Sequence, residues 1–267
     1  MIALADLATH LLRGLGCGVF VWAVLKTAEA APAGVAATVI ALPIAIAAGV
    51  FAMAAHQSPE FVAEAGLRGA QALPALLVFV ITAARLFPRL GAAALIAVAM
   101  AAWLVTVVIV TAGPAWPLGL SAAVLAASLL LSGFVLPFDL ALAAPSKLAG
   151  PARRIWPVAL QAAVIVVVIG LFARTLGPRW SAVLTSIPVA MITVTLGLKS
   201  RGNPGWAATY QSARLAGPTL FVYLATVALA APHWGGLMAA TAGLLPSAAA
   251  AIAATSLRHR LFPRTPA

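Results

Sequence analysis

Charged side chains are scarce in this sequence. Lysine, arginine, aspartate and glutamate make up 8% of its 267 residues, whereas a typical soluble domain carries about 25%. Hydrophobic residues make up 64%, and the mean hydropathy is +1.10. This composition leaves too little polar surface for a water-soluble domain, so it predicts an integral membrane protein.

Acidic residues are the scarcest charged class, with five in the chain. They are Asp6, Glu29, Glu60, Glu64 and Asp139. All five fall in predicted loops or at the ends of apolar segments. Proton-coupled carriers often hold a carboxylate deep in the bundle, so the sequence disfavours coupling through such a group.

Cysteine and histidine are also too sparse to form a metal site or a catalytic site. The single cysteine, Cys17, excludes an intramolecular disulfide and a multi-cysteine metal site. The four histidines are scattered without ligand spacing, and no Gly-x4-Gly-Lys-Ser/Thr loop is present to bind a nucleotide. We therefore expect no enzymatic activity, no metal and no cofactor.

The basic residues that remain give a net charge of +11. They occur singly or in pairs between apolar segments, where cytoplasmic loops of membrane proteins usually carry Lys and Arg. This pattern predicts contact with membrane lipid and no nucleic-acid partner. Arginine is much commoner than lysine, and alanine is abundant. This composition is typical of a bacterium with a GC-rich genome.

Long apolar runs are abundant, and each is long enough to cross a bilayer as a helix. Strict polar–apolar alternation, the signature of a transmembrane β-barrel, does not occur in them. The predicted fold is an all-α polytopic transmembrane helix bundle. Its nine expected spans are 7–26, 33–55, 67–86, 91–112, 116–137, 155–174, 180–198, 212–231 and 235–257.

Two stretches indicate an internal repeat. Residues 43–59 read PIAIAAGVFAMAAHQSP, and residues 188–204 read PVAMITVTLGLKSRGNP, with both flanking prolines repeated 145 positions later. Arg68 and Arg214 recur at nearly the same offset, each at the start of a predicted span. We interpret the chain as a duplicated four-helix unit.

The second copy is predicted to face the opposite way. The fifth span has no counterpart, so residues 1–112 form one repeat, 113–150 a linker helix and loop, and 151–267 the other repeat. One side of this topology collects twelve basic residues and the other four, which places the N-terminus outside and the C-terminus in the cytoplasm. Inverted repeats of this kind recur in secondary transporters.

Short motifs in the second half resemble the GlpM-type family of small bacterial inner-membrane proteins, which are about half this length. The shared motifs are Gly177-Pro178, Ile187-Pro188-Val189-Ala190, Ala213-Arg214, Pro218 and Val222-Tyr223-Leu224. The first half keeps the prolines and Arg68 but has Phe79 near the place of the tyrosine. The resemblance implies a four-helix unit, here fused in tandem, and no defined activity.

Matched residues of the two copies suggest a binding site near the middle of the membrane. The candidate substrate-binding residues are Pro43, Arg68, Thr185, Pro188, Thr195, Arg214 and Tyr223. A proline within a helix frees a backbone carbonyl that can contact a ligand, and an arginine offers several donors to an anionic group.

Each of these residues also has a purely structural interpretation. The prolines can act as packing kinks. Thr185 and Thr195, expected on one face of a single helix around Pro188, can bond to their own helix. Arg68 and Arg214 can reach lipid phosphates at the interface.

The function that this pattern favours is a bacterial inner-membrane secondary transporter or exporter of a small, anionic solute, working by alternating access of the two repeats. A passive channel built on the same halves is an alternative, although no continuous polar stripe is evident for a pore. A non-transporting assembly or regulatory protein is another, supported by the long Ala/Val/Leu helices without deep charge.

Overall fold

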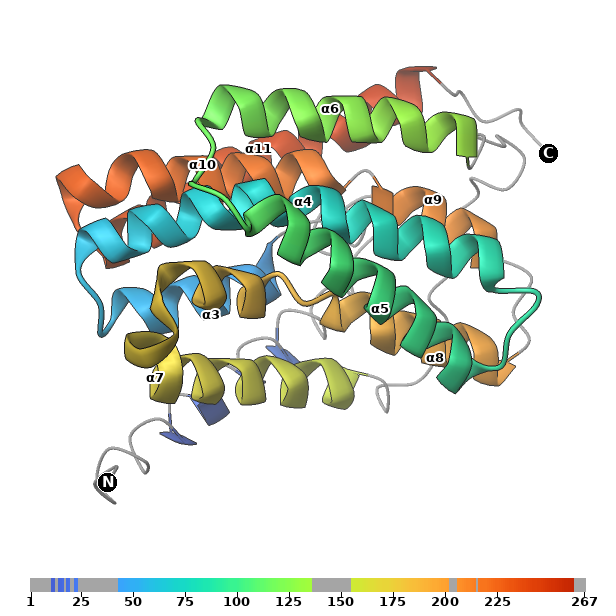
Figure 1. Ribbon diagram of the computed structural model, residues 1–267, viewed down its shortest axis with the longest axis horizontal. Coiled ribbons are helices and arrows are strands. Elements are labelled where there is room, and N and C mark those ends of the chain that lie inside the picture. The colour runs from blue at the N-terminus through green and yellow to red at the C-terminus, as the bar shows by residue number, and fades with distance from the viewer. Residues whose placement is uncertain are drawn as a thin grey trace.

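The computed structural model describes residues 11–12, 14–16, 18–19, 22–23, 43–135, 155–201, 206–214 and 216–261, and in these residues all regular structure is helical. The helices pack as one bundle (Figure 1). They are α3 (Ile44–Ala54), α4 (Pro59–Leu86), α5 (Ala92–Thr111), α6 (Leu118–Val135), α7 (Ile155–Thr185), α8 (Val189–Arg201), α9 (Trp206–Arg214), α10 (Ala216–Trp234) and α11 (Gly236–Leu261).

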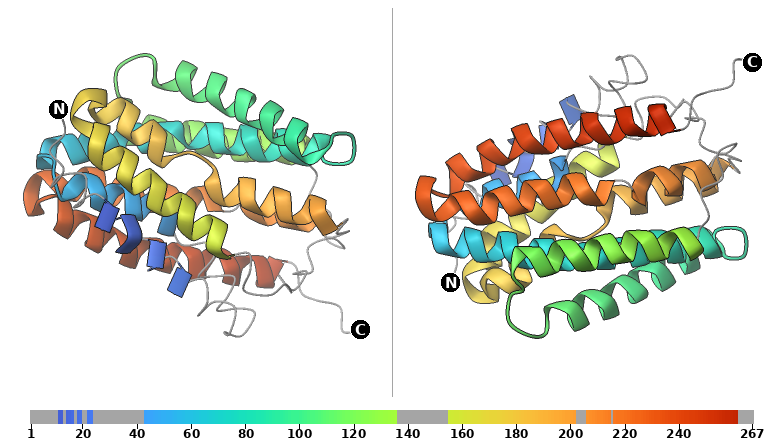
Figure 2. Two further views of the ribbon diagram at one scale, coloured as in Figure 1. Left: turned by 90° about the horizontal axis from the view of Figure 1, so that it is seen from below. Right: turned by 90° about the horizontal axis from the view of Figure 1, so that it is seen from above.

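Several of these helices are suited to crossing a membrane, which confirms the predicted all-α membrane class. Within the described residues, five segments are long and apolar enough to cross, judged by length and composition: Pro59–Leu86, Ala92–Thr111, Leu118–Val135, Ala216–Trp234 and Gly236–Ala254. Their outward faces are apolar: α5 exposes Leu104, Val105 and Ile109, and α6 exposes Leu130 and Phe134. Figure 2 shows the long helices running roughly along one direction, as in a membrane bundle.

The central helix is α4, which contacts α5, α6, α7 and α10. It begins where Ser58 accepts a hydrogen bond from the Phe61 amide, so it starts eight residues before the predicted span at 67. A proline at its first position, Pro59, suits this start because that amide has no helical partner. Most of the predicted loop over 56–66 is therefore helix.

The α4–α10 interface depends on glycine. A Cβ on Gly66 would lie 3.0 Å from both the Leu224 oxygen and the Ala228 nitrogen. Because small residues let membrane helices approach closely, the two backbones can pack together here. The contact also fixes direction: the start of α4 meets the later part of α10, so the two helices run antiparallel (Figure 1).

The predicted linker helix, α6, lies along α4 and runs parallel to it. Near its start, the Trp116 amide donates to the Gln71 side-chain oxygen, and Gln71 in turn donates to the Val110 oxygen. At its end, Arg85 donates to the Val135 oxygen. Contacts from α4 thus hold both ends of α6.

The boundary between the sixth and seventh predicted spans agrees with a break in the structure. The sequence predicts separate spans over 155–174 and 180–198, and α7 consists of two helices that meet at the non-helical Gly177, so that the chain folds back on itself within α7 (Figure 1). That residue has φ 72°, a backbone conformation that glycine adopts readily. A second interruption, at Ser186–Pro188, falls inside the predicted span 180–198, and the next helix follows it directly.

Two further details concern segments outside the long helices. The predicted loop over 199–211 contains most of a helix, α9, whose polar sequence hid it from a search for apolar runs. In the first predicted span, Gly14 and Gly18 lie against α7: a Cβ on Gly14 would be 2.8 Å from the Ala163 oxygen. This glycine pair forms a packing surface.

Candidate functional site

The interruption between α7 and α8 is the main irregularity of the described bundle. The Ser186 amide closes the end of α7 by donating to Ala182, and the Ile187 amide donates to the Leu184 oxygen at 3.4 Å. Pro188 is buried and has no amide hydrogen, so it cannot continue the ladder. Its carbonyl accepts from Ile192 and starts α8.

Pro43 occupies the corresponding place ahead of α3. It is buried, its carbonyl accepts from the Ala47 amide at 2.7 Å, and no side chain caps the helix start. The prediction of a proline inside a continuous helix is thus wrong for Pro188, which precedes a new helix; the residues just before Pro43 lie outside the described part of the chain. At Pro43 and at Pro188 alike, a helix begins directly after a buried proline.

Hydroxyl groups gather at the end of α7. Thr185 and Ser186 are buried and donate to the carbonyls of Ala182 and Val183, at 2.7 and 2.8 Å. Ser181, one turn earlier, is fully buried, and its hydroxyl has no partner among the described residues. Thr185 therefore bonds to its own helix, whereas Ser181 has a donor available.

Thr195 lies on the other side of the interruption and pairs with Tyr210. Their hydroxyl oxygens are 2.7 Å apart, and both residues are fully buried. The ring of Tyr210 also packs edge-on against Phe87, at 6.0 Å between centroids. Because the helix breaks between them, Thr185 and Thr195 do not share a face of one helix as predicted; Thr195 ties α8 to α9 instead.

A cavity of about 180 Å³ adjoins the interruption. Its lining is apolar and comes from α7 and the interruption itself: Val164, Val168, Leu184 and Ile187. The pocket is open on one side, since the lining residue Val164 is 52% exposed. Its apolar walls suit an apolar group better than an ion.

The candidate arginines lie toward opposite ends of α6. Arg68 donates to the carbonyl oxygens of Thr111 and Gly113, ahead of α6, while Arg214 donates to the Ser132 oxygen near its end. Neither lies at a helix start as predicted, since Arg68 is preceded by nine residues of α4 and Arg214 by eight residues of α9. Carbonyls at helix ends favour a nearby cation, so both side chains stabilise helix ends. Full burial also keeps Arg214 from lipid phosphates.

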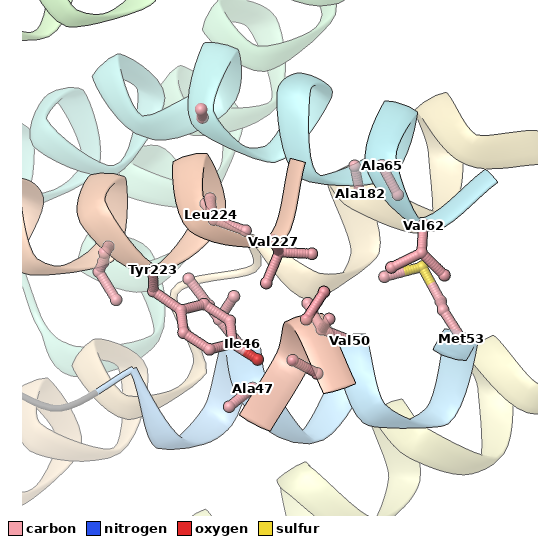
Figure 3. Close-up of a cluster of buried hydrophobic side chains, with 14 of the residues drawn as sticks. Ile46, Ala47, Val50, Met53, Val62, Ala65, Ala182, Tyr223, Leu224 and Val227 are labelled. Atoms are coloured by element: carbon pink, nitrogen blue, oxygen red, sulfur yellow. The ribbon is translucent and has the colours of Figure 1, made fainter. Parts of the chain in front are cut away.

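Tyr223 extends from α10 into the core between α10 and α3 (Figure 3). It is fully buried, and its hydroxyl has no hydrogen-bond partner among the described residues. Gly243 of α11 makes room for the ring, because a Cβ there would lie 2.9 Å from the tyrosine Cδ2. An apolar core thus holds an unpaired hydroxyl.

Sequence reasoning missed three of these groups. Ser181 and Ser186 were hidden within an apolar run, and Tyr210 stood in a segment predicted as loop. One signal was available for Tyr210: it is one of only two tyrosines in the chain. Its pairing across 15 residues could not be read from helical spacing, because the partners lie on different helices.

Scans against protein-family models, curated proteins and solved structures found no match to this chain. The likeness to GlpM-type proteins accordingly stays a prediction that rests on the short motifs of the second half. Function has to be argued from the geometry of the interrupted helix, the buried hydroxyls and the helix pairings.

Proposed function

We propose that this protein is a secondary transporter of the bacterial inner membrane, which moves a small solute by alternating access of two inverted four-helix repeats. The observation that carries the proposal is the interrupted helix at Ser186–Pro188. Transporters with inverted repeats commonly bind their solute where membrane helices are discontinuous, because the ends of the half-helices offer backbone groups near the midplane.

The order of the helices supports the repeat. Shifted by 145 residues, α3 falls on α8, α4 on α9 and α10, and α5 on α11. The cross-contacts are reciprocal: α3 contacts α11, and α8 contacts α5. The antiparallel course of α4 and α10 is what inversion of the second copy requires.

The solute would bind at the ends of the two half-helices. Hydroxyl groups precede one of them: Ser186 is three residues before the α8 start, and Ser181, five residues earlier, has a buried hydroxyl without a partner among the described residues. The apolar cavity beside Ile187 gives room for side chains to move when the repeats rock. The α4–α10 contact, where Gly66 faces Leu224, joins the two repeats at the centre of the bundle.

The test is solute movement in vesicles that contain only the purified protein. A panel of small carboxylates, cations and neutral solutes is offered with and without an imposed pH gradient and membrane potential. Gradient-dependent uptake of one solute, absent from protein-free vesicles, is the expected result. Current driven by voltage alone would favour a channel, and no movement of any solute would favour a non-transporting protein.

A proline variant links transport to the interrupted helix. Pro188→Ala restores an amide and lets α7 and α8 join, so we expect uptake to fall at least tenfold. The control is Pro232→Ala, which changes an exposed proline near the end of α10. Normal uptake by a well-expressed Pro188→Ala variant would remove the interrupted helix from the mechanism.

A further inference from the structure

The two tyrosines of the chain differ in whether their hydroxyl groups have a hydrogen-bond partner. Tyr210 and Tyr223 are both fully buried, but Tyr210 shares a hydrogen bond with Thr195, whereas the Tyr223 hydroxyl has no partner among the described residues. A buried polar group without a partner is costly, and native structures contain few of them. Such a group needs a reason, and a bound ligand that completes the hydrogen bond supplies one.

The described residues around the Tyr223 hydroxyl are apolar and offer it no side-chain hydrogen-bond partner. The ring points toward the first turns of α3, among Ile46, Ala47 and Val50 (Figure 3). Val50 lies 145 positions before Thr195, the partner of the other tyrosine. The position that supplies a hydroxyl in the second copy is therefore apolar in the first.

The same turns of α3 contain a second feature that suits a ligand. This helix begins within the bundle, directly after the buried Pro43, and no side chain caps it. The amides of Ile44 to Ile46 precede its first helical hydrogen bond, which the Ala47 amide donates. The start of a helix attracts negative charge, since these amides and the helix dipole point toward it.

We propose that the first turn of α3 and the Tyr223 hydroxyl bind the carboxylate of the transported solute. The proposal rests on the transporter function given above and names its substrate class. A carboxylate fits because it accepts several hydrogen bonds and carries a single charge. The donors are neutral and the neighbours Ile46 and Val50 apolar, so a doubly charged phosphate would be far more costly to bring out of water.

Acetate is the probe for this site, as the simplest carboxylate. The thermal midpoint of the purified protein is measured in acetate and, at equal ionic strength, in chloride. We expect acetate to raise the midpoint of the wild type more than chloride does. Tyr223→Phe loses only the hydroxyl, and we expect it to weaken acetate protection at least tenfold in concentration.

Two further variants make the test specific. Val50→Thr adds a hydroxyl to the cluster of buried residues around Tyr223, so we expect it to raise the midpoint without acetate and to weaken protection by acetate. Tyr210→Phe is the matched control, because it removes the other buried tyrosine hydroxyl and keeps acetate protection. Tyr223→Phe without acetate should be at least as stable as the wild type, since it removes an unpaired polar group.

The outcomes separate the site from the transport function. Equal protection by chloride and acetate, or full acetate protection in Tyr223→Phe, would overturn the carboxylate site. If acetate protects through Tyr223 but no solute moves in vesicles, the site stands and the transporter function fails. If carboxylate uptake occurs and is unchanged in Tyr223→Phe, transport stands and the site is refuted.

Discussion

The guanidinium of Arg214 donates a hydrogen bond to the backbone oxygen of Ser132 at 2.8 Å, across 82 positions of sequence. The same Nη1 lies 3.3 Å from the Ser132 hydroxyl. Arg214 belongs to the second half of the chain, and Ser132 to the helix between the halves. The contact thus joins α9 to the end of α6, whose last residue also accepts from Arg85 of α4.

This relationship predicts a stability effect. Arg214→Gln removes a charged donor from a buried carbonyl, and we expect it to lower the free energy of unfolding by about 1.5–3 kcal/mol. Ser132→Ala is the control, because it keeps the carbonyl bond and loses only the hydroxyl, with its longer contact to Arg214 and its own bond to the Leu129 oxygen. Thermal unfolding in detergent measures both. An equal loss in the two variants would mean that the carbonyl bond contributes little.

The glycines of α4 predict a graded effect at the contact with α10. Gly66→Ala places a methyl group 3.0 Å from backbone atoms, which cannot move away without shifting a helix. Gly69→Ala meets only the Leu224 side-chain carbons, at 3.1 and 3.2 Å. We expect Gly66→Ala to cost about 1–3 kcal/mol and Gly69→Ala distinctly less.

The control for this pair is Gly119→Ala on α6, where a Cβ would have no neighbour within 4 Å. It should unfold at the wild-type temperature. Chemical or thermal unfolding of the three variants in one detergent gives the order directly. A result in which Gly69→Ala is the most damaging would contradict the antiparallel contact between the two backbones.

The membrane class and the apolar helices could be predicted because they depend on composition and length. The segments 91–112 and 116–137 became α5 and α6 nearly as expected, since no charge interrupts either one. The start of α4 was placed too late because Glu60, Glu64 and Arg68 lowered the local hydropathy, although the helix carries them in its first turns.

The irregular backbone could not be predicted in the same way. The break at Gly177, between the sixth and seventh predicted spans, was expected, but the second break at Ser186–Pro188 falls inside the seventh predicted span. A proline within an apolar segment can either kink a helix or end it, and the helices packed around it decide which. The burial of Arg214 had the same origin: its sequence neighbours suggest a membrane surface, and only the position of α6 encloses it.

The buried pair of Thr195 and Tyr210 predicts a measurable coupling. Thr195→Val leaves the tyrosine hydroxyl unpaired, at a cost of about 1–3 kcal/mol. Tyr210→Phe should cost less, because the threonine can then bond to its own helix. The double variant should resemble Tyr210→Phe alone. A double-mutant cycle by thermal unfolding should therefore give a coupling equal to the Thr195→Val loss, about 1–3 kcal/mol, and additive losses would show that the two hydroxyls do not interact.

The last prediction concerns the orientation of the two halves. In a background with Cys17 replaced by serine, single cysteines are placed at Glu60, Arg89 and Gly202 and labelled in whole cells with a membrane-impermeant maleimide. Glu60 and Arg89 are exposed at opposite ends of α4, and Gly202, outside the described residues, is the sequence counterpart of the loop before α4. The basic residues near Arg89 and Gly202 predict a cytoplasmic position for both.

We expect label at Glu60 in intact cells, and at Arg89 and Gly202 only after the membrane is opened. The two halves repeat the same order of helices, so Glu60 and Gly202 can face different sides only if an odd number of spans separates them. If Glu60 and Arg89 are labelled from the same side, α4 does not cross the membrane. If Glu60 and Gly202 are labelled from the same side and Arg89 from the opposite side, α4 crosses the membrane but the second half is not inverted. Parallel halves would present their equivalent loops to the same compartment.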